Sequence, residues 1–137
     1  MTPLAPDAVE AVITPRRGRN ETAVAPGLLM TFTRPDFQDA CRWTGVGPSR
    51  HVVDCPVREG TWQGRPLTLA GPAPGAPYAV MVLEKLIALG AQKVVAFGWC
   101  GSLRQEAPIG TLIVPDAAYS EEGTSRHYPV GDWEPVP

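Results

Sequence analysis

Residues 71–101 read Gly-Pro-Ala-Pro-Gly-Ala-Pro-Tyr-Ala-Val-Met-Val-Leu-Glu-Lys-Leu-Ile-Ala-Leu-Gly-Ala-Gln-Lys-Val-Val-Ala-Phe-Gly-Trp-Cys-Gly. A stiff loop rich in proline and glycine opens this stretch. Apolar residues then recur at helical spacing, which predicts a helix over Tyr78–Leu89 that stops at Gly90. Lys93–Phe97 is a near-continuous apolar run, typical of a strand covered on both faces. A loop, a helix and a strand in this order predict an α/β fold with a largely parallel or mixed sheet.

The segment before this unit predicts a strand followed by a capped helix. Leu28–Phe32 is a short apolar run and is expected to be a strand. Thr33 and Asp36 have the spacing of a helix start, so a helix is expected over about Pro35 to Trp43.

The remaining segments predict short strands and irregular chain. His51–Val57 and Leu67–Ala70 are expected to form a hairpin whose turn covers Gly60–Pro66. Gly110–Val114 and Ala117–Tyr119 are expected to be further strands. The tail from Ser120 to Pro137 is polar and shows no periodicity.

Composition limits the classes of protein and of partner. The chain has 137 residues, enough for one domain, and 44% of them are apolar, so a packed core is expected. The net charge is −2, from 12 basic and 14 acidic residues, which gives no general attraction to nucleic acid or to an anionic membrane. No apolar run approaches the roughly 18 residues of a membrane span.

Cysteine usage and the first residues bear on the compartment. Cys41, Cys55 and Cys100 are an odd number without a CxxC spacing, which argues against a zinc site and a disulfide scaffold. Residues 1–10 carry two acids and no basic region, so a signal peptide is not expected. A reducing, cytoplasmic location is the expectation.

Two stretches could carry chemistry. Gly98–Ser102 follows a predicted strand, and ligands in open α/β sheets collect at the carboxyl ends of strands. Its glycines allow backbone N–H groups to approach an anion, although a tight turn with Trp99 and Cys100 in the core is the alternative. Glu121–Tyr128 is polar at nearly every position, which fits either a solvated loop or the wall of a polar-ligand pocket.

Four linked motifs together resemble a known family. They are Gly75-Ala76-Pro77 leading into the helix end at 84–91, Gly98-x-Cys100-Gly101-Ser102-Leu103, Ile109-Gly110-Thr111-Leu112-Ile113-Val114-Pro115, and Glu122-Gly123-Thr124-Ser125. In this order and spacing they resemble the nucleoside phosphorylase family, which includes uridine phosphorylase, the hexameric purine nucleoside phosphorylases and related nucleosidases. The resemblance is good over residues 71–129 and loose over 28–70.

The resemblance implies an α/β fold with a central mixed, partly barrel-like sheet flanked by helices. It also implies cleavage of the N-glycosidic bond of a nucleoside by phosphate or water. Family domains run to roughly 230–280 residues. Residues 28–137 therefore resemble the amino-terminal half of such a domain, with residues 1–27 as an irregular arm. The implied partners are a nucleoside or nucleobase, and either further copies of the chain or a complementary second-half chain.

Three departures from the family pattern leave the nucleophile open. Thr33-Arg34-Pro35-Asp36 stands where phosphate-binding members carry a Gly-Asp-Pro-x-Arg loop. Ala96 and Phe97 stand where they carry an arginine, and Trp99 replaces a threonine or serine. Inorganic phosphate is thus an uncertain co-substrate, and no other cofactor is expected. The alternative function is an inactive relative that serves as a nucleoside-binding or oligomerisation module.

The predicted substrate-binding residues fall into two kinds. Backbone or shape contacts are expected from the two glycine-bearing loops, and polar contacts from the later loop. No catalytic residue and no metal ligand are assigned. The expected substrate-binding residues are Gly75, Trp99, Cys100, Gly101, Arg126 and His127.

Overall fold

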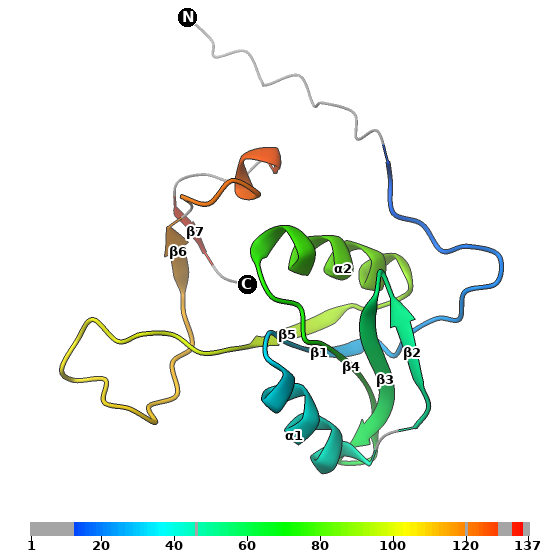
Figure 1. Cartoon of the computed structure of the whole chain (residues 1–137), viewed down its shortest axis with the longest axis horizontal. Coiled ribbons are helices and arrows are strands. Elements are labelled where there is room, and N and C mark those ends of the chain that lie inside the picture. The colour runs from blue at the N-terminus through cyan, green and yellow to red at the C-terminus, as the bar shows by residue number, and fades with distance from the viewer. Residues whose placement is uncertain (1–12, 46, 120, 129–132, 136–137) are drawn as a thin grey trace, which may run out of the picture.

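The computed structural model describes residues 13–45, 47–119 and 121–128, and the backbone of 133–135 (Figure 1). Strands and helices are mixed along the chain, and three successive strands lie between the two α-helices. The elements are β1 (Gly27–Thr31), α1 (Arg34–Thr44), β2 (Ser49–Val52), β3 (Cys55–Trp62), β4 (Arg65–Ala70), α2 (Ala76–Ala88), β5 (Lys93–Phe97), β6 (Ala117–Tyr119), the 3₁₀ helix η1 (Ser125–His127) and β7 (Trp133–Pro135).

Five strands form one mixed sheet in the order β2-β3-β4-β1-β5. β1 is parallel to both β4 and β5, whereas β2, β3 and β4 are antiparallel neighbours. β6 and β7 form a separate antiparallel pair. The predicted mixed sheet flanked by helices is confirmed.

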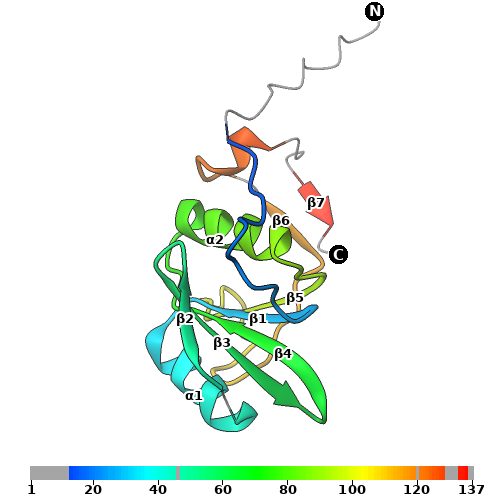
Figure 2. The same cartoon turned by 90° about the vertical axis from the view of Figure 1, so that its right-hand side faces the viewer.

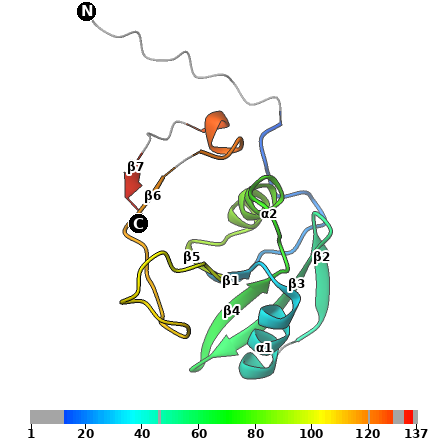
Figure 3. The same cartoon turned by 60° about the vertical axis from the view of Figure 1, so that its left-hand side comes forward.

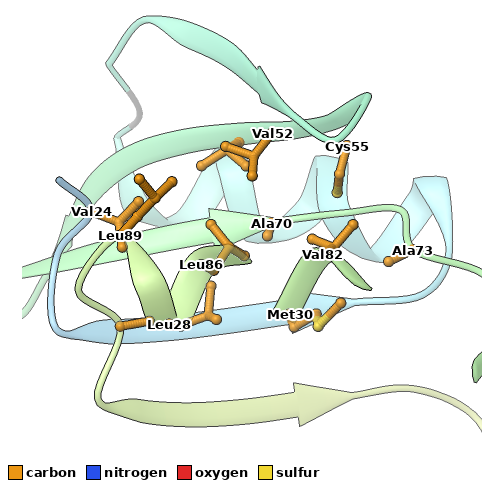
Figure 4. Packing of buried hydrophobic residues seen from close by; sticks show 12 residues of the cluster. Val24, Leu28, Met30, Val52, Cys55, Ala70, Ala73, Val82, Leu86 and Leu89 are labelled. Carbon is orange, nitrogen blue, oxygen red and sulfur yellow. The ribbon is translucent and has the colours of Figure 1, made fainter. Parts of the chain in front are cut away.

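The two helices cover opposite faces of the sheet (Figure 2). Alternate side chains of a strand point to opposite faces. Leu28 and Met30 of β1 therefore pack with Val82 and Leu86 of α2 (Figure 4). Leu29 of β1 instead packs in the smaller cluster formed with α1. The core is thus two layers divided by the sheet.

Local sequence sets the ends of both helices. Thr33 caps α1, and its hydroxyl accepts a hydrogen bond from the Asp36 N–H. α2 ends with two reverse hydrogen bonds, from Gly90 N–H to the Ile87 carbonyl and from Ala91 N–H to the Leu86 carbonyl, each 3.0 Å. This is a Schellman motif with glycine at positive φ after the cap. The predicted helix starts and stops are confirmed to within two residues.

The expected hairpin contains an additional turn. His51–Val57 was expected to be one strand, but Val53 and Asp54 form a turn between β2 and β3. Both have positive φ, 51° and 60°, which suits a two-residue hairpin turn but is unusual for valine. The second turn is shorter than the predicted Gly60–Pro66 and consists of Gln63 and Gly64. The pairing of β3 with β4 is confirmed.

The prediction that β5 is covered on both faces is wrong. All five of its side chains are exposed, with Val95 at 62%. β5 pairs only with β1 and forms the outer edge of the described sheet. The two helices pack over the other strands. Within the described part of the chain, nothing covers the apolar side chains of β5.

The structure corrects two further expectations about the later segments. Gly110–Val114 is irregular rather than a strand, and Leu112 and Val114 are largely exposed. No described segment pairs with it. Ala117–Tyr119 is a strand as predicted, but its partner β7 lies in the tail, where no element was expected.

Residues 13–26 contain no helix or strand but are attached to the core by polar contacts. Lys85 Nζ donates to the Glu21 carboxylate at 2.6 Å and to the Arg16 carbonyl at 2.7 Å. The Arg50 guanidinium donates to the hydroxyl and carbonyl of Thr22. The first twelve residues of the predicted arm lie outside the described residues. No described helix is long and apolar enough to cross a membrane.

We predict that Leu86→Ala destabilises the fold far more than Ile87→Ala. Leu86 is fully buried in the α2 cluster, whereas the neighbouring Ile87 is 53% exposed. Removing a buried leucine side chain costs about 2–5 kcal/mol of unfolding free energy. Urea denaturation followed by circular dichroism measures both variants. Equal losses would contradict the assigned orientation of α2.

Candidate functional site

Three parallel strands end at one edge of the sheet. The register pairs Ala70 of β4 with Met30 of β1, and Met30 with Ala96 of β5. The three strands therefore end side by side. The loops that follow are 32–33, 71–75 and 98–101. Ligands bind at such carboxyl edges in open α/β sheets, which makes this edge the first candidate site.

Two glycines let these loops approach each other closely. A Cβ on Gly71 would lie 2.7 Å from the Thr31 carbonyl oxygen, and one on Gly98 would lie 2.8 Å from Cδ2 of Phe32. The Ala73 N–H donates to the Thr31 carbonyl at 3.1 Å. The close approach of the β1 and β4 loops therefore needs a residue without a side chain at position 71.

Trp99 connects the β5 loop to the start of α1. Its indole Nε1 donates to both oxygens of the Asp36 carboxylate, at 2.9 and 3.2 Å. The Thr33 hydroxyl donates to the same carboxylate. Trp99 is nonetheless 80% exposed, so it does not fill the core as the alternative interpretation required. The carboxyl edge thus presents the exposed indole ring of Trp99 beside the Asp36 carboxylate, and the hydrogen bonds between them fix the orientation of the ring.

The other predicted residues of this edge are open to solvent. Gly75 is the N-cap of α2 with φ of 83°, and no side chain caps the helix there. Cys100 is a free, exposed thiol, and a Cβ on Gly101 would meet no atom within 4 Å. Trp99, Cys100 and Gly101 are consecutive on the loop that follows β5, and Gly75 lies on the loop that follows β4, so all four leave the carboxyl edge of the sheet.

Arg126 and His127 lie away from the loops of the carboxyl edge, near a second candidate site. Both lie in η1, which sits beside α2 (Figure 3). A cleft of about 700 Å³ separates α2 from this loop, and His127 lines it whereas Arg126 does not. Tyr128 donates its hydroxyl to Glu84 Oε1 at 2.8 Å and closes one side. The cleft is lined by Ala76, Pro77, Val80, Met81, Glu84, Glu122, Gly123, Thr124, His127 and Tyr128.

Glu122 organises the loop that forms this cleft. Its carboxylate accepts hydrogen bonds from the Thr124 N–H at 2.8 Å and from the Ser125 N–H at 2.6 Å, and also from the Ser125 hydroxyl. The Ser125 hydroxyl bond, followed by the two backbone bonds, lowers the pKa of Glu122 to about 2. Glu122 is therefore an anion that fixes η1. Tyr128 belongs to the stretch expected to form a pocket wall, but sequence reasoning missed its contact with Glu84, because the two residues are 44 positions apart.

Among residues 13–45, 47–119 and 121–128, no three histidine, cysteine, aspartate or glutamate side chains are grouped as a metal ion needs. The three cysteines are free.

Gly71→Ala is expected to destabilise the protein by about 1–3 kcal/mol, because the added methyl group meets backbone and the edge loops must separate. Gly101→Ala adds the same atom where no neighbour lies within 4 Å and serves as the matched control. Thermal unfolding compares the two. If both variants melt alike, the edge loops are not held by this close approach.

Ser125→Ala is expected to raise the pKa of Glu122 toward the usual 4.5 of a glutamate, because the largest stabilising contact of the carboxylate is removed. Because the pKa of Glu122 is lower in the folded state than in the unfolded state, the ionised carboxylate stabilises the folded loop at pH values above the unfolded-state pKa. That stabilisation is lost as the pH falls through about 2. Carbon-13 NMR titration of the carboxyl group measures the shift. Ser102→Ala is the control, since the Ser102 hydroxyl contacts the Arg104 backbone instead. An unchanged Glu122 pKa in Ser125→Ala would contradict the contact.

Sequence comparison finds relatives over part of the chain. A 77-residue stretch is 31% identical to a guanosine phosphorylase of Halorubrum lacusprofundi, covering 56% of this chain and 32% of that protein. A 69-residue stretch is 33% identical to a uridine phosphorylase of Thermococcus kodakarensis, covering 50% and 25%. The chain therefore spans about a third or less of the length of these relatives.

The comparison with solved structures agrees with the sequence comparison. The crystal structure of a uridine phosphorylase from Vibrio fischeri, complexed with 6-hydroxy-1-naphthoic acid, matches with a TM-score of 0.70 at 24% identity. The match covers 77% of this chain and 44% of that one, so the fold described here corresponds to part of the larger fold. The family model of the phosphorylase superfamily matches residues 28–136. The resemblance drawn from the four linked motifs is confirmed, and the chain belongs to the phosphorylase superfamily.

Proposed function

We propose that this chain supplies the strand-end edge of an enzyme that cleaves the N-glycosidic bond of a nucleoside, and that Trp99 forms part of its nucleoside-binding surface. The observation that carries the proposal is the anchored and exposed indole of Trp99 beside the Asp36 carboxylate. An aromatic face of this kind stacks on a base or packs on a sugar. Family membership supplies the general kind of reaction.

The charge at this edge favours water over phosphate as the nucleophile. Cleavage of an N-glycosidic bond develops positive charge on the ribose, which a nearby carboxylate stabilises. The same carboxylate repels a phosphate dianion. Asp36 lies in the first turn of α1. The positive end of the helix dipole at this position would otherwise attract an anion such as phosphate. We therefore favour hydrolysis of the nucleoside.

A second candidate function is assembly without turnover. The exposed apolar side chains of β5 support it, because an uncovered apolar strand is typical of a surface that another chain covers. In this case the edge binds a nucleoside but the bond is not cleaved.

Release of free base from a panel of purine and pyrimidine nucleosides, with and without inorganic phosphate, tests the proposal. Release without phosphate supports hydrolysis. Release that requires phosphate overturns the choice of water but keeps the reaction. Binding without release supports the assembly function. The absence of both binding and release from this chain overturns the proposed nucleoside site.

Trp99→Ala is expected to weaken nucleoside binding about tenfold, since aromatic stacking contributes roughly 1–3 kcal/mol per base. Trp43→Ala is the matched control, because Trp43 is also exposed but lies in the last turns of α1, away from the carboxyl edge. Isothermal titration calorimetry measures both. Equal affinity in Trp99→Ala and the unchanged protein would exclude Trp99 from the site.

A further inference from the structure

The carboxylate of Asp36 is shared by two features that lie far apart in the sequence. It belongs to the cap of α1, where the Asp36 N–H donates to the Thr33 hydroxyl at 3.3 Å and that hydroxyl donates back to the carboxylate. The same carboxylate accepts from Nε1 of Trp99, which follows 63 positions later. A continuous chain of hydrogen bonds therefore runs from the helix cap to the indole at the carboxyl edge.

Asp36 is held firmly at the start of α1. Pro35 precedes it in the first turn, and the proline ring fixes the backbone φ there. Phe37 follows it and is buried in the cluster between α1 and the sheet. The Phe37 N–H also donates to the Thr33 carbonyl at 3.2 Å. The carboxylate of Asp36 therefore has a fixed position relative to the sheet.

Trp99 depends on this carboxylate for its orientation. The side chain is 80% exposed, so packing against the core does not select one rotamer. In the described part of the chain, no other side chain of residues 98–103 is hydrogen-bonded to the helices or the sheet, because the Ser102 hydroxyl contacts only the Arg104 backbone. The two bonds to Asp36, at 2.9 and 3.2 Å, are what hold the ring in place.

We propose that Asp36 is a positioning residue for Trp99, which orders the indole before a nucleoside binds. Asp36 has this role only if the carboxyl edge binds a nucleoside as proposed above, and the role is distinct from the effect of its charge. Ordering a free side chain on binding weakens affinity. An indole that a fixed carboxylate already holds avoids this loss, so the base binds more tightly.

Two substitutions of Asp36 separate position from charge. Asp36→Asn removes the charge but keeps an oxygen that can accept from the indole N–H, and the Thr33 hydroxyl can rotate to accept from the new amide. Asp36→Ala removes both the charge and the acceptor. If Asp36 acts by position, the asparagine variant keeps what the alanine variant loses.

The indole N–H signals in a proton–nitrogen NMR correlation spectrum report the contact directly. The chain contains four tryptophans, and the loss of one signal in Trp99→Phe assigns that of Trp99. In Asp36→Ala this signal is expected to move upfield, toward that of a solvated indole, whereas in Asp36→Asn it stays closer to its original position. The signal of Trp43, in the last turns of α1, is expected to stay in place and shows that the helix remains folded.

Calorimetric titration with the nucleoside panel measures the effect on binding. Asp36→Ala is expected to weaken affinity about fivefold, and Asp36→Asn less than about twofold. Asp39→Asn is the matched control, because Asp39 is an acid on the same helix that pairs with Arg42. It is expected to change neither the Trp99 signal nor the affinity.

A Trp99 signal that does not move in Asp36→Ala overturns the positioning role. Equal losses of affinity in the asparagine and alanine variants also overturn it, because charge alone then explains the effect. If the unchanged protein binds no nucleoside, the proposed function fails and the role of Asp36 in binding fails with it. The indole signal distinguishes that result from the absence of the contact between Asp36 and Trp99.

Discussion

Strand β1 is the element on which the rest of the structure depends. It is hydrogen-bonded to β4 on one side and β5 on the other, and its alternating side chains serve two cores. Leu28 and Met30 are almost fully buried beneath α2. The carboxyl end of the same strand leads into Thr33 and α1. The position of β1 therefore fixes both helices and the edge at which the three parallel strands end.

Local signals in the sequence were sufficient for much of this fold. The cap at Thr33 and the stop at Gly90 depend on residues within one helical turn, so a short window of sequence contains them. The turn at Val53 and Asp54 was missed because a valine rarely adopts a positive φ. The turn connects β2 to β3, which pair antiparallel on either side of it. The exposure of β5 could not be predicted from its local sequence either. An apolar composition shows that a strand is suited to a core, but not whether other elements cover it.

The same distinction applies to the sites. The loop holding Trp99 could be predicted because it follows an apolar strand, and strand ends collect ligands. Its contact with Asp36 joins residues 63 positions apart and needed the fold.

The open edge of β5 has a consequence for the behaviour of the chain in solution. Within the described residues, one side of this strand presents backbone N–H and C=O groups with no partner strand, flanked by Val94, Val95 and Phe97. Such an edge is a template for any extended segment, including the same strand of another molecule. Self-association should then rise steeply with concentration, and a short peptide of alternating apolar residues should compete with it. Charged substitutions along β5 would act as solubilising gatekeepers.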